Sequence, residues 1–157
     1  MNWEALIASS RALVTPIPPD GQPTDEALRR AISTAYYAMF HALAASNADC
    51  IIGTSNDPLS RHAWDRVYRG LEHGTSRAQL REGRRLFSPD TRWFGDTFGR
   101  LQEIRQKADY DHAETFTANL AITWIDRAEE AIRGFMPASI EERTAVAVQS
   151  LIRRRRN

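Results

Sequence analysis

The chain contains a single cysteine, Cys50, among its 157 residues. An internal disulfide is therefore excluded, and no cluster of cysteine and histidine has the spacing of a zinc finger. Neither a secreted disulfide scaffold nor a structural zinc site is supported. The composition instead predicts a protein of the reducing cytoplasm, with no metal or other cofactor.

Long apolar runs are also missing. No segment approaches the ~20 consecutive apolar residues that a membrane span needs. Residues 1–11 include Trp3 and Glu4, and they lack the basic end and unbroken apolar stretch of a signal peptide. Because 42% of the residues are hydrophobic, the chain has enough apolar side chains for a substantial core. We expect one soluble domain over residues 1–157 that does not associate with membranes.

Several catalytic motifs are absent. The chain has no glycine-rich phosphate loop, no His-Glu-x-x-His and no nucleophile elbow. The sequence therefore lacks the motifs needed for nucleotide hydrolysis by a phosphate loop, for zinc proteolysis and for α/β-hydrolase chemistry.

Lysine is almost absent, since Lys107 is the only one among 21 basic residues. The others are arginines, whose guanidinium suits bidentate phosphate contacts better than ammonium does. Net charge is only +1, but arginines are frequent in residues 61–85 and acids dominate residues 109–130. The distribution predicts a basic side and an acidic side. The alternative explanation is that genomic codon bias favours arginine, and that the charged residues only form solvated faces without a function in binding.

No stretch alternates apolar and polar residues for long enough to form a sheet. Proline and glycine concentrate in three predicted loops, at residues 15–23, 53–58 and 88–90. The predicted fold class is all-α, an up-and-down helical bundle with extra short helices and a C-terminal helix and basic tail over 136–157. Helices are expected at about residues 3–14, 24–47, 60–71, 76–86, 91–107, 113–135 and 140–155.

The predicted helix 24–47 carries three adjacent stripes at i, i+4, i+7 spacing. Alanines form one stripe, which lets another helix approach closely, and bulky side chains form a second, core stripe. The third presents polar or amphipathic tips that suit a wet groove or a subunit interface. Its members are Arg30, Thr34, Tyr37 and His41. For Tyr37 and His41, structural hydrogen bonds are the alternative to a catalytic role.

Arg105 lies in the last turn of the predicted helix 91–107. It is on the same face as the aromatic residues that this helix is expected to bury. His112 follows and is expected near the N-terminus of the next helix. A helix N-terminus disfavours imidazolium whereas Asp109 and Asp111 favour it, so the protonation state of His112 stays open. A histidine balanced in this way suits general acid–base catalysis.

Two segments carry a resemblance to a known family. The run 28–42, Leu-Arg-Arg-Ala-Ile-Ser-Thr-Ala-Tyr-Tyr-Ala-Met-Phe-His-Ala, resembles the second helix of the HEPN superfamily, notably of its small single-domain branch. Residues 105–111, Arg-Gln-Lys-Ala-Asp-Tyr-Asp, resemble the second hallmark of that branch. The resemblance spans both ends of the bundle core and implies a HEPN-like helical bundle.

Many HEPN proteins are metal-independent endoribonucleases with an arginine, a polar residue and a histidine a few positions later. Arg105, Gln106 and His112 match that pattern. The resemblance implies a homodimer that brings both copies of Arg105 and His112 into one cleft on the two-fold axis. His112 would move protons during attack of the ribose 2′-hydroxyl on RNA, and Arg105 would stabilise the charge on the phosphate. The expected supporting or substrate-binding residues are Gln106, Asp109, Tyr110, Tyr37 and His41.

Two hypotheses follow. In the first, the protein is a ribonuclease toxin or defence effector of a toxin–antitoxin type system, paired with a minimal nucleotidyltransferase as family precedent suggests. In the second, it is a non-catalytic dimeric helical module that binds a partner protein, a nucleotide or RNA. The pair Arg105 and His112 favours the first. The Ala-Asp-Tyr-Asp insertion at residues 108–111, typical of family members without established nuclease activity, favours the second, and Arg105 would then simply pair with Asp109 or Asp111.

Overall fold

The computed structural model describes residues 2–15 and 21–153, so part of the predicted first loop and Arg154 to Arg156 of the basic tail lie outside the described residues. The described part is helical and contains no strand, which confirms the all-α prediction. No helix in it is long and apolar enough to cross a membrane. Its elements are α1 (Trp3–Val14), α2 (Asp25–Ile52), α3 (Pro58–Arg69), α4 (His73–Gly83), the 3-10 turn η1 (Arg84–Leu86), α5 (Pro89–Tyr110), α6 (Ala118–Phe135) and α7 (Ile140–Leu151).

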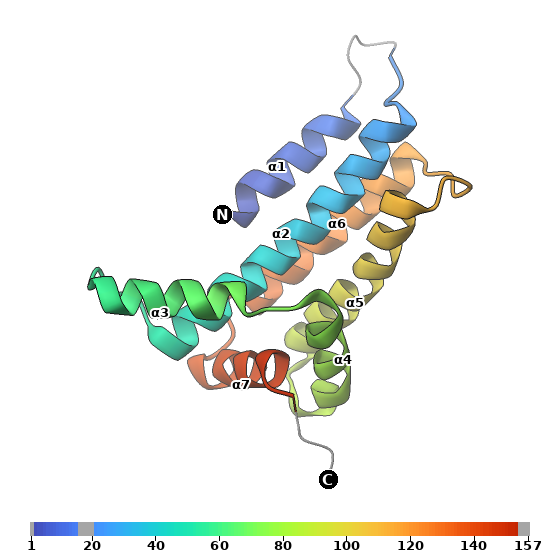
Figure 1. Ribbon diagram of the computed structural model, residues 1–157. Helices are drawn as coiled ribbons and strands as arrows, with labels where there is room; N and C mark the ends of the chain where they lie inside the picture. Colours follow the sequence, from blue (N-terminus) through green and yellow to red (C-terminus); the bar gives the residue numbers. More distant parts are fainter. Residues whose placement is uncertain (1, 16–20, 154–157) are drawn as a thin grey trace.

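Four helices lie side by side and run alternately up and down: α1, α2, α5 and α6 (Figure 1). The shorter helices α3, α4 and α7 lie across the lower end of this group in the view of Figure 1. α2 is central, because α1, α3, α5, α6 and α7 all pack against it. The core is therefore organised around one helix.

The stripes predicted along α2 explain this central position. Ala31, Ala35, Ala38 and Ala42 are all at most 1% exposed, so their methyl groups form a seam on which neighbouring helices pack closely. The predicted core stripe is buried as well. The polar stripe is left partly accessible, as its chemistry predicted.

α2 extends beyond its predicted end near residue 47. Asn47 and Ala48 are fully buried, and the Asp49 carboxylate accepts a hydrogen bond from Trp64 Nε1 at 2.8 Å. These tertiary contacts outweigh the weak helix preference of Asn47 and Asp49. The helix ends at Ile52, and its C-cap is Gly53, whose φ of +82° is a conformation that favours glycine.

The start of the sixth helix was predicted at residue 113 and is wrong, since α6 begins at Ala118 with Thr117 as its N-cap. The reason is Arg29 on α2. Its guanidinium donates to the carbonyl oxygens of Ala108 at 3.0 Å and Asp111 at 2.9 Å, and also to that of Glu114. These carbonyls would otherwise accept bonds in a continuing helix, so the chain between α5 and α6 stays non-helical, with a turn at residues 112–113.

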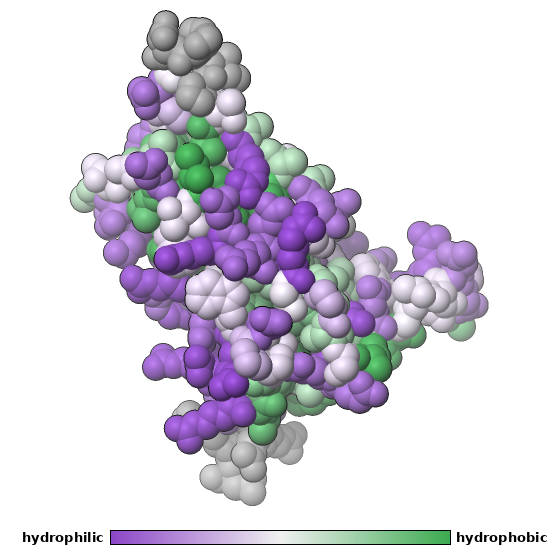
Figure 2. Space-filling view, turned by 180° about the vertical axis from the view of Figure 1, so that it is seen from behind, coloured by the Kyte–Doolittle hydropathy of each residue, from purple (hydrophilic) through white to green (hydrophobic). Residues whose placement is uncertain are grey.

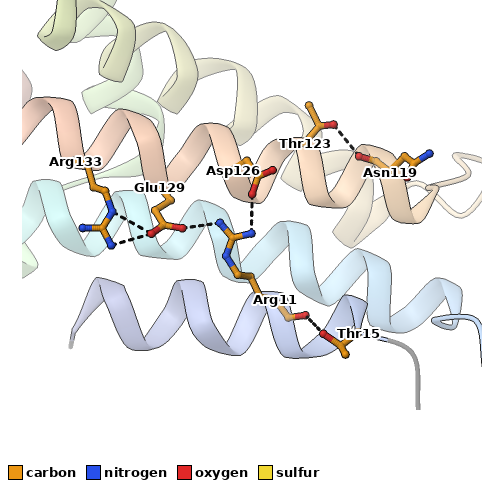
Figure 3. A network of polar contacts seen from close by, with 7 residues as sticks. All are labelled: Arg11, Thr15, Asn119, Thr123, Asp126, Glu129 and Arg133. Carbon is orange, nitrogen blue, oxygen red and sulfur yellow. Dashed lines mark hydrogen bonds and ion pairs between the residues drawn. The ribbon is translucent and has the colours of Figure 1, made fainter. Parts of the chain in front are cut away.

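Arg11 on α1 fixes the N-terminal helix to α6. It donates to Asp126 and to Glu129, both at 2.6 Å, and Arg133 donates to the other oxygen of Glu129 at 2.9–3.0 Å (Figure 3). The hydrogen bonds from Arg11 and then Arg133 lower the pKa of Glu129. Because Arg11 and Asp126 are about half exposed, each pair adds at most about 1 kcal/mol.

The arginines of residues 61–85 belong to three elements, α3, α4 and η1. The helix α3 packs against α2, whereas α4 and η1 pack against α5. Two arginines of α4 and η1 pair with α5 acids, Arg77 with Glu103 and Arg84 with Asp96. Seen from behind, hydrophilic side chains cover most of the face, with smaller hydrophobic areas between them (Figure 2).

Removal of the Arg29 side chain tests the origin of the α5–α6 connection. We expect Arg29→Ala to lower the free energy of unfolding by roughly 2–3 kcal/mol, because a charged group with several carbonyl acceptors is lost. The neighbouring exposed Arg30 has no side-chain partner among the described residues, and Arg30→Ala should stay within about 0.5 kcal/mol of wild type. Urea unfolding measures both. Unchanged amide exchange in residues 107–117 of Arg29→Ala would contradict the account.

Candidate functional site

A group of aromatic, histidine and arginine side chains lies where α2 meets α3, α4 and α5. We call it the Tyr-His-Arg cluster. The middle of α2 supplies its tyrosine pair and one histidine, the last turn of α3 a third tyrosine, the first residue of α4 a second histidine, and α5 an arginine. Its members are Tyr36, Tyr37, His41, Tyr68, His73 and Arg105.

Arg105 is held on several sides. Its Nη2 donates to the Tyr37 hydroxyl at 3.0 Å, and its guanidinium carbon lies 5.7 Å and 5.3 Å from the ring centres of Tyr36 and Tyr37. Nε lies 2.7 Å from an oxygen of Asp109, one turn further along α5. The geometry at Nε is that of an ion pair rather than an aligned hydrogen bond. With a side chain only 15% exposed, the guanidinium is fixed in place.

His73 faces Arg105 from α4. Its Nδ1 lies 2.6 Å from the Tyr36 hydroxyl, and its ring stacks on Phe40 with centres 4.1 Å apart. Burial first, and the positive charge of Arg105 second, lower the pKa of His73. Burial raises the pKa of Tyr36, so the phenol is neutral. A neutral imidazole has one donor and one acceptor nitrogen, so Nδ1 and Nε2 of His73 take opposite roles.

A second pair of histidine and tyrosine lies about one turn further along α2, with the histidine, His41, on α2. Its Nδ1 lies 2.5 Å from the Tyr68 hydroxyl, and the two rings stack with an interplanar angle of 14°. Tyr68 in turn stacks on Trp64, whose Nε1 donates to Asp49. Burial lowers the pKa of His41 and raises that of Tyr68. Both histidines of the cluster are therefore biased toward the neutral form near about pH 7.

This combination suits proton transfer beside an anion. A fixed guanidinium binds and stabilises a phosphate, and a neutral imidazole accepts a proton near physiological pH. Within residues 2–15 and 21–153, no group of three or more His, Cys, Asp or Glu side chains is placed to hold a metal ion.

The predicted site residues divide into two groups. Tyr37, His41, Arg105 and Asp109 lie in or directly against the cluster. Gln106 and Tyr110 are exposed, and they line a shallow hollow on the outer face of α5.

His112 lies in the exposed turn after Asp111, the C-cap of α5. It was predicted next to the N-terminus of the following helix, and this is wrong because α6 begins only at Ala118. Its side chain makes no hydrogen bond or ion pair with other described residues. Within one protomer, the structure thus places His73 and His41, rather than His112, in the group that contains Arg105.

Sequence reasoning missed His73 and Tyr68. His73 follows the short link at residues 70–72 and belongs to no apolar periodicity, and its predicted helix began only at residue 76. Tyr68 sits one turn after Trp64 on α3, a spacing typical of any helix face. Only the packing of α3 and α4 against α2 reveals their role.

Acidification tests the two histidine environments. Their folded-state pKa values lie below the ordinary 6.5, so below that pH the unfolded chain binds more protons than the folded chain. The stabilisation is present above about pH 6.5 and is lost as the pH falls through the folded pKa values. We expect the melting temperature of wild type to fall between about pH 6.5 and pH 5, and to fall less in the double variant His41→Gln, His73→Gln. Differential scanning calorimetry across this range checks both slopes.

The variant His62→Gln is the matched control for this measurement, since His62 is exposed on α3. It should keep the wild-type slope. A double variant with that same slope would show that burial of His41 and His73 has no effect on their protonation.

Comparison with models of protein families, with curated proteins and with solved structures found no match in any of the three. The resemblance to the HEPN superfamily therefore remains a prediction that rests on residues 28–42 and 105–111.

Proposed function

We propose that the protein is a metal-independent endoribonuclease of HEPN type, in which Arg105 binds the scissile phosphate. The observation that carries this proposal is the guanidinium of Arg105, fixed by Tyr37 and Asp109 beside two imidazoles with lowered pKa. Positioned charge and proton carriers are the parts that phosphodiester transfer needs when no metal takes part.

The reaction is transfer of the phosphoryl group to the neighbouring ribose. A general base removes the proton from the 2′-hydroxyl, and the 2′-oxygen attacks the adjacent phosphorus. Arg105 stabilises the negative charge that grows on the non-bridging oxygens. A general acid gives a proton to the departing 5′-oxygen, which leaves a 2′,3′-cyclic phosphate and a 5′-hydroxyl. The need for the 2′-hydroxyl restricts the substrate to RNA.

The proton carriers have two candidate sources. His73 and His41 lie in the same protomer as Arg105, and Tyr36 and Tyr68 orient their rings. His112, the residue that the family pattern points to, lies in an exposed turn, from which it would approach the Arg105 of a second protomer. The first source needs no dimer, whereas the second requires an isologous homodimer.

The proposed biological role is that of a toxin or defence effector with a minimal nucleotidyltransferase as its partner. This part rests on the family resemblance alone. The same holds for a cytoplasmic location.

A second function is favoured by one specific contact. Asp109 lies 2.7 Å from Nε of Arg105 and competes with any phosphate for its charge. In a non-catalytic helical module, the cluster would stabilise the junction of α2 with α4 and α5. The groups near Arg105 would then serve recognition of a partner protein, a nucleotide or RNA.

Cleavage of cellular RNA by the purified protein in EDTA separates these functions. We expect wild type to cleave RNA and Arg105→Ala to lose at least about a hundredfold in rate, the usual effect of removing a group that stabilises transition-state charge. His73→Ala and His41→Ala should lose about a hundredfold or more if they carry protons, with His112→Ala nearly unchanged. The opposite ranking would assign proton transfer to His112.

Circular dichroism and gel filtration are run on every variant, so that loss of fold or of dimerisation is not mistaken for loss of chemistry. His62→Ala, on the exposed face of α3, is the matched histidine control and should retain full activity. If partner-free wild type cleaves no RNA over a range of substrates, the non-catalytic module replaces the enzyme.

A further inference from the structure

A groove lies between α4 and α5. It encloses a volume of about 400 Å³, within the range of ligand sites, and arginines are its most frequent lining residues. We call it the α4–α5 groove. Its arginines are Arg77, Arg81, Arg84, Arg92 and Arg100.

The groove keeps an excess of positive charge. Its two acids are both paired, since Glu103 binds Arg77 and Arg100, and Asp96 binds Arg84. Two acids against five arginines leave an excess of three positive charges in the lining. Arg81 and Arg92 form no ion pair with another described residue, so their guanidinium groups are available to an anion.

The floor of the groove is apolar, and its α5 wall contains two glycines. Leu80 and Phe87 are buried beneath the arginines, and Gly95 and Gly99 lie one turn apart on the α5 wall. A Cβ at either glycine would meet its neighbours only at ordinary contact distances, 3.8 Å to Leu80 and 3.6 Å to Arg77. Packing therefore does not require glycine here, although each glycine weakens a helix interior. The two glycines leave this stretch of the α5 wall without side chains.

Arg77 relates the groove to the Tyr-His-Arg cluster. It lines the groove, and its charge also acts on the Tyr36 phenol that binds His73. Glu103, which pairs with Arg77, lies two residues before Arg105 on α5.

We infer that the α4–α5 groove binds the phosphate backbone of single-stranded RNA next to the cluster, with Arg81 and Arg92 as phosphate ligands. The inference rests on the proposed function for the identity of the polymer. Unpaired guanidinium groups above an apolar floor suit a strand whose phosphates need charge and whose bases need a surface to pack on. An acidic protein segment would use the charge but not a site for bases.

The test is binding of a fluorescent 2′-O-methyl oligoribonucleotide, measured by anisotropy at several salt concentrations. This probe lacks the attacking hydroxyl, so binding is measured whether or not the protein cleaves RNA. We expect Arg81→Ala with Arg92→Ala to weaken binding at least about tenfold, and to reduce the slope of log K against log salt by about 1.4 for two lost phosphate contacts.

The matched control is Arg61→Ala with Arg66→Ala, which removes the same charge from exposed positions on α3. It should bind within about twofold of wild type apart from the general salt effect. Melting curves by circular dichroism establish that both double variants are folded.

Three results would overturn the inference: equal losses in the two double variants, wild-type affinity in Arg81→Ala with Arg92→Ala, or no binding of the oligonucleotide by wild type. In the last case, binding of a labelled polyglutamate peptide would identify an acidic protein as the occupant. If the groove variants bind the oligonucleotide weakly while wild type cleaves no RNA, the proposal of an RNA-binding groove is retained. Only the proposal of endoribonuclease activity is then rejected.

Discussion

The burial of α2 among five other helices is the constraint on which the rest of the structure depends. A helix in that position needs a surface that neighbours approach closely, and the seam from Ala31 to Ala42 supplies it without large side chains. Bulky residues on the adjacent stripe then fill the space between α2, α5 and α6. The remaining stripe cannot be buried completely because its tips are polar, and it is this stripe that meets α3, α4 and α5 at the cluster.

Polar groups within the cluster are paired because they are largely withdrawn from water. Tyr36 is fully buried, and an unpaired hydroxyl there would cost about 1–3 kcal/mol. The imidazole of His73 satisfies it and is itself kept neutral by the same burial. Withdrawal from water also strengthens the attraction between Arg105 and any anion that reaches it. Stability and reactivity thus have a common physical origin at this site.

The sequence was informative where one helix determines the outcome. Periodicity placed α1 and the start of α2, and it identified which face of α2 carries Tyr37 and His41. Periodicity failed where a side chain distant in sequence determines the start of a helix. Arg29 donates hydrogen bonds to the carbonyls of Asp111 and Glu114, and α6 therefore begins later than predicted. No local pattern states which carbonyl a guanidinium on another helix will bind.

The site shows the same division. Arg105, Tyr37, His41 and Asp109 were predictable because their spacing fixes the face each one occupies. His73 was not, because it lies at the start of a short helix whose position depends on its packing against α5 and α7. His112 looked close to Arg105 along the chain, yet the end of α5 at Tyr110 removes the helical geometry that would relate the two.

Tyr36 and Tyr37 are consecutive residues, yet one hydroxyl binds His73 of α4 and the other binds Arg105 of α5. Because both belong to one unbroken helix, the distance between these two anchors is independent of loop length. Insertions or deletions in the link 53–57 would leave it unchanged. A single residue inserted between Tyr37 and His41 would instead rotate the two halves of the cluster by about 100° relative to each other. Homologues are therefore expected to vary in their loops while α2 keeps an invariant length through this segment.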